Sequence, residues 1–297
     1  MTGSPDPRRR AWALLLATLL AAGCAPGPPP PPASDLPAVP ARRIIALAPH
    51  LAELAYAAGA GDYLVGTVAF SDHPAAARAL PRVGDAFRID LEALASLRPD
   101  LLLGWPSGNS PAALQRLRQL GYRVVELEPG KLMALGDQIE QIGQLAGTGE
   151  TARASAVAWR KGLAALEAAH GTTRAGRVFY QVAPEPLITV TGRHFIGEAI
   201  ELCGGDNVFA DLPGLTAVVS VESVLAAAPG VIIANDYTRG AGAPATGSPL
   251  DTWQAWPRMP AVRDGRLHLL DPDLMSVPGP RLLEGISRLC AALAGSS

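Results

Sequence analysis

One pattern of apolar and polar positions occurs twice along the chain, 130 positions apart. Residues 90–104 read DLEALASLRPDLLLG, and residues 220–234 read SVESVLAAAPGVIIA. In each copy, apolar residues at helical spacing are followed by a proline-containing turn and then by an unbroken apolar run. Each copy therefore predicts a short helix and a buried strand. Two copies predict two similar α/β lobes, with a ligand cleft between them.

Short apolar runs alternate with helical patterns through the rest of the chain, and this alternation is typical of mostly parallel sheets. Around the first copy we expect strands at 43–47, 63–67 and 124–127, with helices at 51–58 and 111–120. Around the second copy we expect strands at 177–182, 187–190 and 267–270, with a final helix from Arg281.

Residues 131–170 are almost entirely helical in pattern and are broken only at Gly147-Thr148-Gly149. The part after the break has about twenty residues without proline, which as a helix would be roughly 30 Å long. We therefore expect one long rigid helix over 149–170, joining a lobe at 41–148 to a lobe at 171–297. The alternative is a plain surface helix of the second lobe.

The N-terminus has the pattern of a targeting segment. Three arginines at 8–10 precede an apolar run at 11–22, which is shorter than the roughly 20 residues that span a bilayer. Small residues lead directly into Cys24, as in bacterial lipoprotein signals. We expect a signal at 1–23, lipid on Cys24, and an extended proline-rich tether at 24–40. The alternative is an ordinary secretory signal with a chance cysteine.

Charge and motifs exclude several classes of function. The formal net charge is −2, and no basic stretch occurs in the region expected to fold, so a nucleic-acid partner is not expected. No Gly-x-Ser-x-Gly, phosphate-binding loop or His/Cys metal spacing appears, so an enzyme and a resident metal are not expected either. Cys203 and Cys290 would pair in an oxidising compartment, and two reduced buried thiols are the alternative.

Several segments, taken in order, resemble the periplasmic substrate-binding proteins of the cobalamin and ferric-siderophore class. The segments are FSDHP at 70–74, RPDL at 98–101 followed by Trp105, LCGGDNVF at 202–209, and Pro280-Arg281. The likeness extends from 42 to 293, and the cobalamin-binding members of the class are the most similar.

The resemblance implies two α/β lobes joined by one long helix, and a disulfide between Cys203 and Cys290. It also implies a monomer without a resident cofactor, held in the periplasm or at the cell surface by lipid on Cys24. Such a protein captures a corrinoid, either cobalamin or cobinamide, and delivers it to the permease dimer of an ATP-binding-cassette (ABC) importer with its ATPase subunits. Haem and ferric siderophores are alternative ligands. A cofactor-processing enzyme or chaperone at the membrane surface is the alternative from a different class.

Glu92 and Glu222 occupy matching places in the two copies of the repeat. In the family, one glutamate on each lobe docks to arginines on the two permease subunits. Two like charges at equivalent places suit a two-fold symmetric partner. The alternative is that each glutamate complements the dipole of the helix whose first turn it occupies.

The remaining candidates concern the ligand. Trp105 follows a strand and is expected to pack on the flat, largely apolar ring of a corrinoid. Phe70 takes the place of a cleft tyrosine, and Asp273 aligns with a cleft aspartate that would accept hydrogen bonds from corrin amides. His50 and His73 lie on expected cleft loops, where a neutral imidazole could ligate cobalt or iron.

The chain also departs from the pattern of the cobalamin-binding members. The family arginine four residues beyond the cleft aspartate falls on Val277, and two cleft tryptophans fall near Ala86 and Thr216. Phe87 and Phe195 lie close enough in the sequence to replace part of that aromatic surface.

Overall fold

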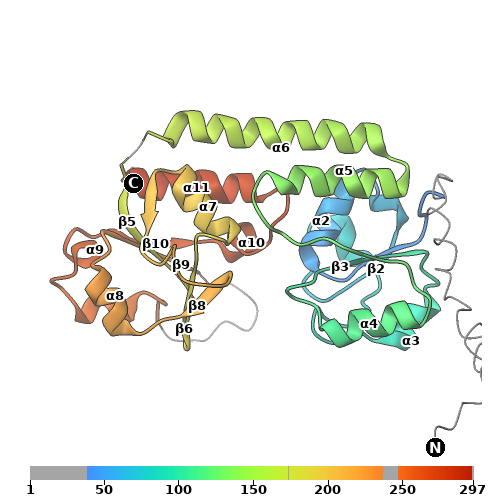
Figure 1. Ribbon diagram of the computed structural model, residues 1–297, viewed down its shortest axis with the longest axis horizontal. Coiled ribbons are helices and arrows are strands. Elements are labelled where there is room, and N and C mark those ends of the chain that lie inside the picture. The colour runs from blue at the N-terminus through green and yellow to red at the C-terminus, as the bar shows by residue number, and fades with distance from the viewer. Residues whose placement is uncertain (1–38, 173, 237–246, 296–297) are drawn as a thin grey trace, which may run out of the picture. The chain divides into compact units, whose positions relative to one another are not determined.

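The computed structural model describes residues 39–172, 174–236 and 247–295 (Figure 1). The expected signal, the lipidation site Cys24 and nearly all of the proline-rich tether lie outside the described residues, so these expectations stay predictions.

In the described part of the first lobe, a four-stranded sheet has the order β2-β1-β3-β4, and every neighbouring pair of strands is parallel. The strands are β1 (Ile44–Ala46), β2 (Leu64–Thr67), β3 (Leu101–Gly104) and β4 (Val124–Glu126). The helices are α2 (Pro49–Ala57), α3 (Leu91–Ser96), α4 (Pro111–Gln119) and α5 (Ala134–Ala146), with 3-10 turns η2 (Gly61–Tyr63) and η3 (Ala75–Ala79).

Successive side chains of a strand point to opposite faces of the sheet, and here both faces are covered. Ile44 and Leu101 pack with apolar residues of α2 and α5 on one face. Ile45 and Leu102 pack with those of α3 and α4 on the other. Burial on both faces explains why β1 and β3 are continuous apolar runs, which the sequence pattern allowed us to find.

The second lobe has a sheet of order β10-β9-β5-β6-β8, with β7 paired to β5, within the described residues. Only the β5–β6 and β6–β8 pairs among these are antiparallel. The strands are β5 (Gly176–Pro184), β6 (Leu187–Val190), β7 (Gly205–Asn207), β8 (Thr216–Val218), β9 (Val231–Asn235) and β10 (Leu267–Leu270). The helices are α7 (Phe195–Leu202), α8 (Val221–Ala227), α9 (Pro260–Arg263), α10 (Pro272–Met275) and α11 (Leu282–Ala294), with the 3-10 turn η5 (Asp251–Ala255).

The repeat seen in the sequence is a repeat in the structure. Its first copy forms α3 and β3, and its second forms α8 and β9. The side chains of Asp90 and Ser220 cap the two helices by accepting hydrogen bonds from backbone N–H groups of the first turn. The residues before the two prolines, Arg98 and Ala228, both have a left-handed backbone with φ of +45°.

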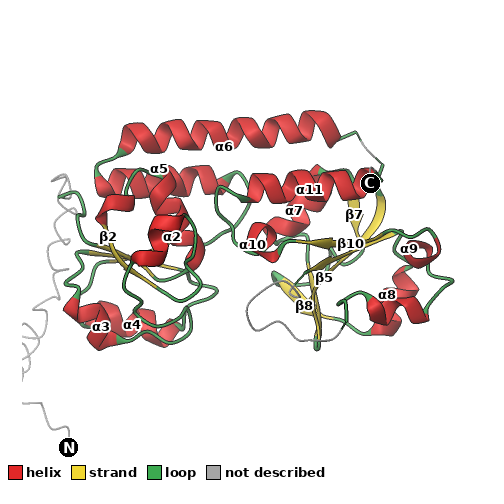
Figure 2. Cartoon of the chain, turned by 180° about the vertical axis from the view of Figure 1, so that it is seen from behind, coloured by secondary structure: helices red, strands yellow, loops and turns green. Residues whose placement is uncertain are grey.

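Helix α6 (Gly149–His170) has 22 residues and packs against helices of both lobes (Figures 1 and 2). Its partners are α2 and α5 in the first lobe and α7 and α11 in the second. Gly162 lets α11 approach closely, because a Cβ there would lie 2.6 Å from Leu283 Cδ1. The predicted fold class is therefore confirmed: two α/β lobes with mostly parallel sheets, joined by one long helix.

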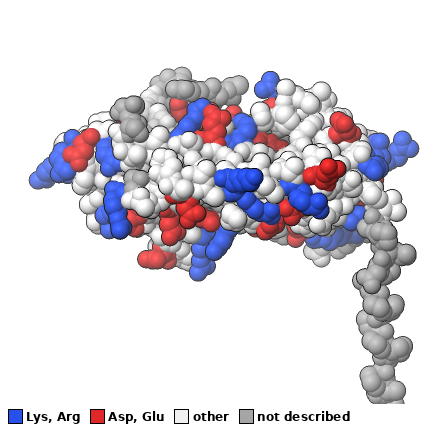
Figure 3. Space-filling model, turned by 90° about the horizontal axis from the view of Figure 1, so that it is seen from above, with Lys and Arg blue, Asp and Glu red and all other residues white. Residues whose placement is uncertain are grey.

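Charges of both signs are interspersed on the face seen in Figure 3. Arg160 of α6 forms ion pairs with Asp137 at 2.6 Å and Glu140 at 2.8 Å, both on α5. These pairs tie the long helix to the first lobe.

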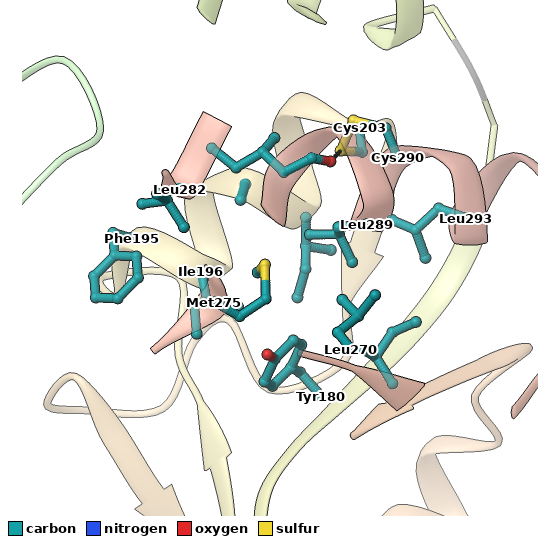
Figure 4. Packing of buried hydrophobic residues seen from close by; sticks show 14 of the residues in the cluster. Tyr180, Phe195, Ile196, Cys203, Leu270, Met275, Leu282, Leu289, Cys290 and Leu293 are labelled. Carbon is teal, nitrogen blue, oxygen red and sulfur yellow. Dashed lines mark hydrogen bonds between the residues drawn. A yellow bond between two sulfur atoms is a disulfide. The ribbon is translucent and has the colours of Figure 1, made fainter. Parts of the chain in front are cut away.

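The disulfide between Cys203 and Cys290 confirms the pairing implied by the resemblance. It joins the end of α7 to α11 inside the main apolar cluster of the second lobe (Figure 4). Tyr180, Leu289 and Leu293 lie in the same cluster. Within the described residues, no helix combines the length and apolar character needed to cross a membrane.

Candidate functional site

The candidate site lies at the carboxyl edge of the first sheet, where three neighbouring parallel strands end. β1 leads into the turn that starts α2, β2 leads into the loop containing Phe70, and β3 leads into the loop that starts at Trp105. In open α/β sheets this edge is where ligands bind.

A cavity of about 140 Å³ lies between this edge and the second lobe, and we call it the interlobe hollow. Of the six predicted ligand residues, it brings together Phe70, His73 and Asp273. Its lining residues are Pro49, Glu53, Phe70, Ser71, Asp72, His73 and Arg78 from the first lobe and Asp273, Val277 and Arg281 from the second. Larger hollows over α6 and α7 (about 500 Å³) and beside Trp256 (about 440 Å³) contain none of the predicted ligand residues.

The loop after β2 exposes Phe70 to solvent, and hydrogen bonds from Arg82 fix the backbone of this loop. Arg82 donates hydrogen bonds to the carbonyl oxygens of Val68 at 3.2 Å and Ser71 at 3.1 Å, and to Asp72 Oδ1 at 3.1 Å. Phe70 itself is 82% exposed and has a left-handed φ of +64°. A non-glycine residue held in that region costs of order 1 kcal/mol, and such strain is concentrated at functional sites.

Trp105 is half-buried against the apolar core of the first lobe and does not line the interlobe hollow. Its ring lies over Gly108, where a Cβ would approach Trp105 Cζ3 to 2.1 Å. The indole Nε1 is buried and has no hydrogen-bond partner among the described residues. Phe87 is exposed on a neighbouring loop and does not line the hollow either.

Asn109, which the sequence analysis missed, connects these loops. It is 3% exposed, and its Oδ1 accepts a hydrogen bond from the Trp105 backbone N–H at 2.7 Å. Its Nδ2 donates to Leu47 O at 2.8 Å and to Ala86 O at 2.7 Å. One amide thus ties the Trp105 loop to the end of β1 and to the loop that carries Phe87.

His50 is the predicted candidate that is placed least favourably for ligand contact. It is 2% exposed, and its ring packs edge-on against Trp105 with centroids 5.1 Å apart. Burial lowers the pKa of His50 to about 3, so the imidazole is neutral at pH 7. His50 therefore supports Trp105 from within the lobe, and a direct contact between His50 and ligand stays a prediction.

The second lobe contributes Asp273 through α10, which follows β10. Asn235 at the end of β9 holds this region, because it accepts a hydrogen bond from Tyr180 at 2.6 Å and donates to Ser276 Oγ at 3.2 Å. Val277, at the position where the resemblance implied an arginine, lines the hollow. The expectation that Phe195 supplies aromatic surface to the cleft is wrong. Phe195 begins the amphipathic helix α7, and its side chain is 5% exposed and packs in the core of the second lobe.

The floor of the hollow holds an ion pair between the lobes that the sequence analysis also missed. Arg281, at the start of α11, donates to Glu53 of α2 through Nη2 at 2.6 Å and through Nε at 3.2 Å. The only sequence signal for Glu53 was a lone carboxylate within the apolar helix at 49–57.

Glu92 and Glu222 stand at the second position of α3 and α8, on separate lobes. Hydrogen bonds from its own backbone N–H and from Ser220 lower the pKa of Glu222, which keeps this exposed carboxylate ionised. No group of His, Cys, Asp and Glu in the described part of the chain is arranged to hold a metal ion.

Residues 44–274 match the periplasmic binding protein family, and the chain belongs to that family. A vitamin B12-binding protein of Vibrio cholerae is 37% identical to it over 255 residues, which cover 86% of this chain and 90% of the relative. The crystal structure of the periplasmic vitamin B12-binding protein BtuF of Vibrio cholerae superposes with a TM-score of 0.78 at 36% identity, covering 87% of this chain and 99% of that one. A periplasmic haem-binding protein from Pseudomonas aeruginosa gives a TM-score of 0.74 at 27% identity, covering 86% and 94%.

The burial of His50 predicts a pH-dependent stability. Its pKa is about 3 when folded and about 6.5 when unfolded, so between these values only the unfolded chain binds the proton. The free energy of unfolding therefore falls as pH falls through this window, by about 2 kcal/mol between pH 7 and pH 5 for this one group. We expect His50→Gln to remove this part of the pH dependence of the free energy of unfolding, measured by urea titrations at a series of pH values. The slope from His194, whose pKa burial lowers to about 4, remains in both proteins; equal slopes in wild type and variant would refute the assignment.

The hydrogen bonds of Asn109 predict a local as well as a global effect. In Asn109→Ala the carbonyls of Leu47 and Ala86 lose their donor, which should cost about 2 kcal/mol in free energy of unfolding. Hydrogen exchange should become faster at 84–90 and 105–110. Asn207→Ala is the matched control, because this buried asparagine donates to Val190 O and accepts from Phe209 N in the second lobe. If the control raises exchange in the same loops, Asn109 has no special role there.

Proposed function

We propose that this protein binds a corrinoid in the interlobe hollow and delivers it to the permease dimer of an ABC importer. It would act in the periplasm as a monomer, anchored by lipid on Cys24, and would carry out no chemistry. The observation that carries the proposal is the combination, at one interlobe hollow, of an exposed aromatic ring on Phe70 and the carboxylate of Asp273. The vitamin B12-binding relatives support the same ligand class.

The charges of the hollow favour a corrinoid over an anionic ligand. Three carboxylates and two guanidinium groups line it, a formal charge of −1 with histidine counted as neutral. The periphery of a corrinoid carries amides, whose N–H groups can donate to Asp273 and Asp72. Haem brings two propionates and many siderophores bring several oxyanions, and both would meet an excess of negative charge.

The size of the hollow indicates how the ligand would lie. Ligand pockets usually have about 300–1,000 Å³, and the hollow has about 140 Å³. A corrin ring is therefore expected to lie across the mouth of the hollow, with the face of Phe70 against it and peripheral amides reaching toward the floor. Each 100 Å² of apolar ring surface removed from water would contribute roughly 2.5 kcal/mol.

Haem is the second candidate ligand. The solvent-exposed His73, which lines the hollow, favours it, because a neutral imidazole is a common iron ligand. The haem-binding protein from Pseudomonas aeruginosa supports it through the shared fold.

Ligand titrations separate these candidates. The purified protein is titrated with cyanocobalamin, cobinamide, haem and a panel of ferric siderophores, and binding is followed by tryptophan fluorescence and equilibrium dialysis. We expect submicromolar binding of the corrinoids, weakened about tenfold by Phe70→Ala, which removes a lining residue of the hollow. Trp105→Ala should also weaken it, because the Trp105 loop lies at the same carboxyl edge of the first sheet, where a ring across the mouth of the hollow would reach it. Trp256→Ala, which removes a partly exposed tryptophan outside the hollow, is the control and should leave the affinity unchanged. Tight haem or siderophore binding without a corrinoid response would replace the ligand assignment.

Delivery to the importer predicts a separation of binding from uptake. Replacing Glu92 and Glu222 together by arginine should reduce corrinoid uptake by cells at least tenfold, because the two introduced guanidinium groups would meet the permease arginines as like charges. The corrinoid affinity of the purified variant should not change. Reversal of the exposed Glu167 and Glu185 is the matched control and should leave uptake intact. Normal uptake with the Glu92/Glu222 variant would exclude the docking role.

A further inference from the structure

We propose that Glu53 determines the specificity of the hollow for ligands with amide groups over ligands with carboxylates, by holding Arg281 in an ion pair on the floor. The proposal rests on the corrinoid-binding function above and concerns how that site selects among ring ligands of similar shape.

Two nitrogens of Arg281 contact the carboxylate of Glu53, so the ion pair is bidentate. Nη2 of Arg281 lies 2.6 Å from Glu53 Oε1, and Nε lies 3.2 Å from both carboxylate oxygens. The Glu53 side chain is 5% exposed and that of Arg281 is 26% exposed, and both line the hollow. The Nε–Nη2 edge of the guanidinium, which would suit a ligand carboxylate, is therefore occupied by a carboxylate of the protein.

The backbone of the second lobe holds Glu53 in place. A Cβ on Gly279 would lie 2.7 Å from Glu53 Oε2 and 3.2 Å from its Cβ. The segment before α11 thus lies directly on the glutamate, and it leaves little room for the carboxylate to swing away. A ligand carboxylate could not take its place without leaving the buried Glu53 charge unpaired, which is strongly unfavourable.

The remaining cation of the hollow, Arg78, provides only a solvent-exposed contact for an anion. Burial disfavours the charged form of Arg281, but the hydrogen bonds and charge of Glu53, with the charges of Asp273 and Asp271, outweigh it and raise the pKa of Arg281. Arg78 is exposed, and its Nε donates to Asp72 O at 2.9 Å. A carboxylate entering the hollow would lose its hydration and meet Glu53 and Asp273, whereas a neutral amide pays no such penalty.

The test uses two pairs of ligands that differ in charge and hardly in shape. The first pair is cyanocobalamin and its monocarboxylic acid, in which one peripheral propionamide is hydrolysed. The second pair is haem dimethyl ester and haem. For each pair, the measured quantity is the ratio of the dissociation constant of the carboxylate ligand to that of its neutral counterpart.

In the wild-type protein we expect both ratios to exceed one. Glu53→Gln keeps the size of the side chain and an acceptor for Arg281 but removes the charge, so it should lower each ratio at least tenfold. Glu53→Asp keeps the charge and shortens its reach, so it should lower the ratios less, and it provides a second variant if Glu53→Gln folds poorly. Arg281→Met in the Glu53→Gln background should restore ratios above one, because the freed cation is then absent.

Glu140→Gln is the matched control, because it removes a partner of Arg160 at 2.8 Å between α5 and α6, outside the hollow. This variant should leave the ratios unchanged. If Glu53→Gln weakens both members of a pair equally, Glu53 is only a structural residue and the proposal is overturned, while corrinoid binding by the wild type would still support the proposed function. If neither corrinoid binds but the haem pair does, the proposed function fails and the haem ratios still decide the role of Glu53. Failure of both pairs to bind would overturn both proposals.

Discussion

The single long helix α6 is the constraint on which the arrangement of the site depends. It packs on α2 and α5 of one lobe and on α7 and α11 of the other, so one helix holds both lobes in place. Small residues make this close packing possible: a Cβ on Gly143 would lie 2.2 Å from that of Ala152, and Gly162 lies under Leu283. An α-helix bends sharply only at proline, glycine pairs or inserted groups, and α6 lacks proline. The hollow is therefore largely preformed, and a ligand would need to order little beyond the loops that contact it.

The two lobes share a repeat but not a chemistry. The matched helices α3 and α8 are each capped by a side chain and each have a glutamate at their second position, which is the pairing that the proposed docking to a symmetric permease dimer would use. The hollow does not share this symmetry. The first lobe supplies the exposed ring of Phe70 and the loops tied together by Asn109, whereas the second supplies Asp273 and Arg281. The repeat accounts for the matched elements α3–β3 and α8–β9, whereas the residues that line the hollow differ between the two lobes.

The sequence predicted the parts of the structure that depend on local or periodic signals. The apolar runs of β3, β9 and β10 and the long helix at 149–170 were found because burial on both faces, or helical spacing without proline, leaves a clear pattern. The strands β7 and β8 were missed, because each has only three residues and is defined by its pairing with β5 or β6 rather than by a buried apolar run. His50 was a candidate because the start of the helix was expected to point it at the cleft. In the structure its side chain is 2% exposed, and a direct contact with ligand stays a prediction. Glu53 and Arg281 are 228 positions apart, and no local pattern could have joined them.

The ion pair between Glu53 and Arg281 also shows why stability alone does not explain this site. Taking both charges out of water costs several kcal/mol per ion before their attraction offsets it, and a well-packed apolar pair of similar volume is often equally or more stable. An apolar floor, however, would accept any flat ring ligand and would give no directional contact to peripheral groups. In the proposed site, Glu53 neutralises Arg281 on the floor. Asp273 and the neighbouring carboxylates can then accept hydrogen bonds from ligand amides, and they repel additional carboxylates. The cost in stability is then a cost of discrimination between ligands whose rings are otherwise alike.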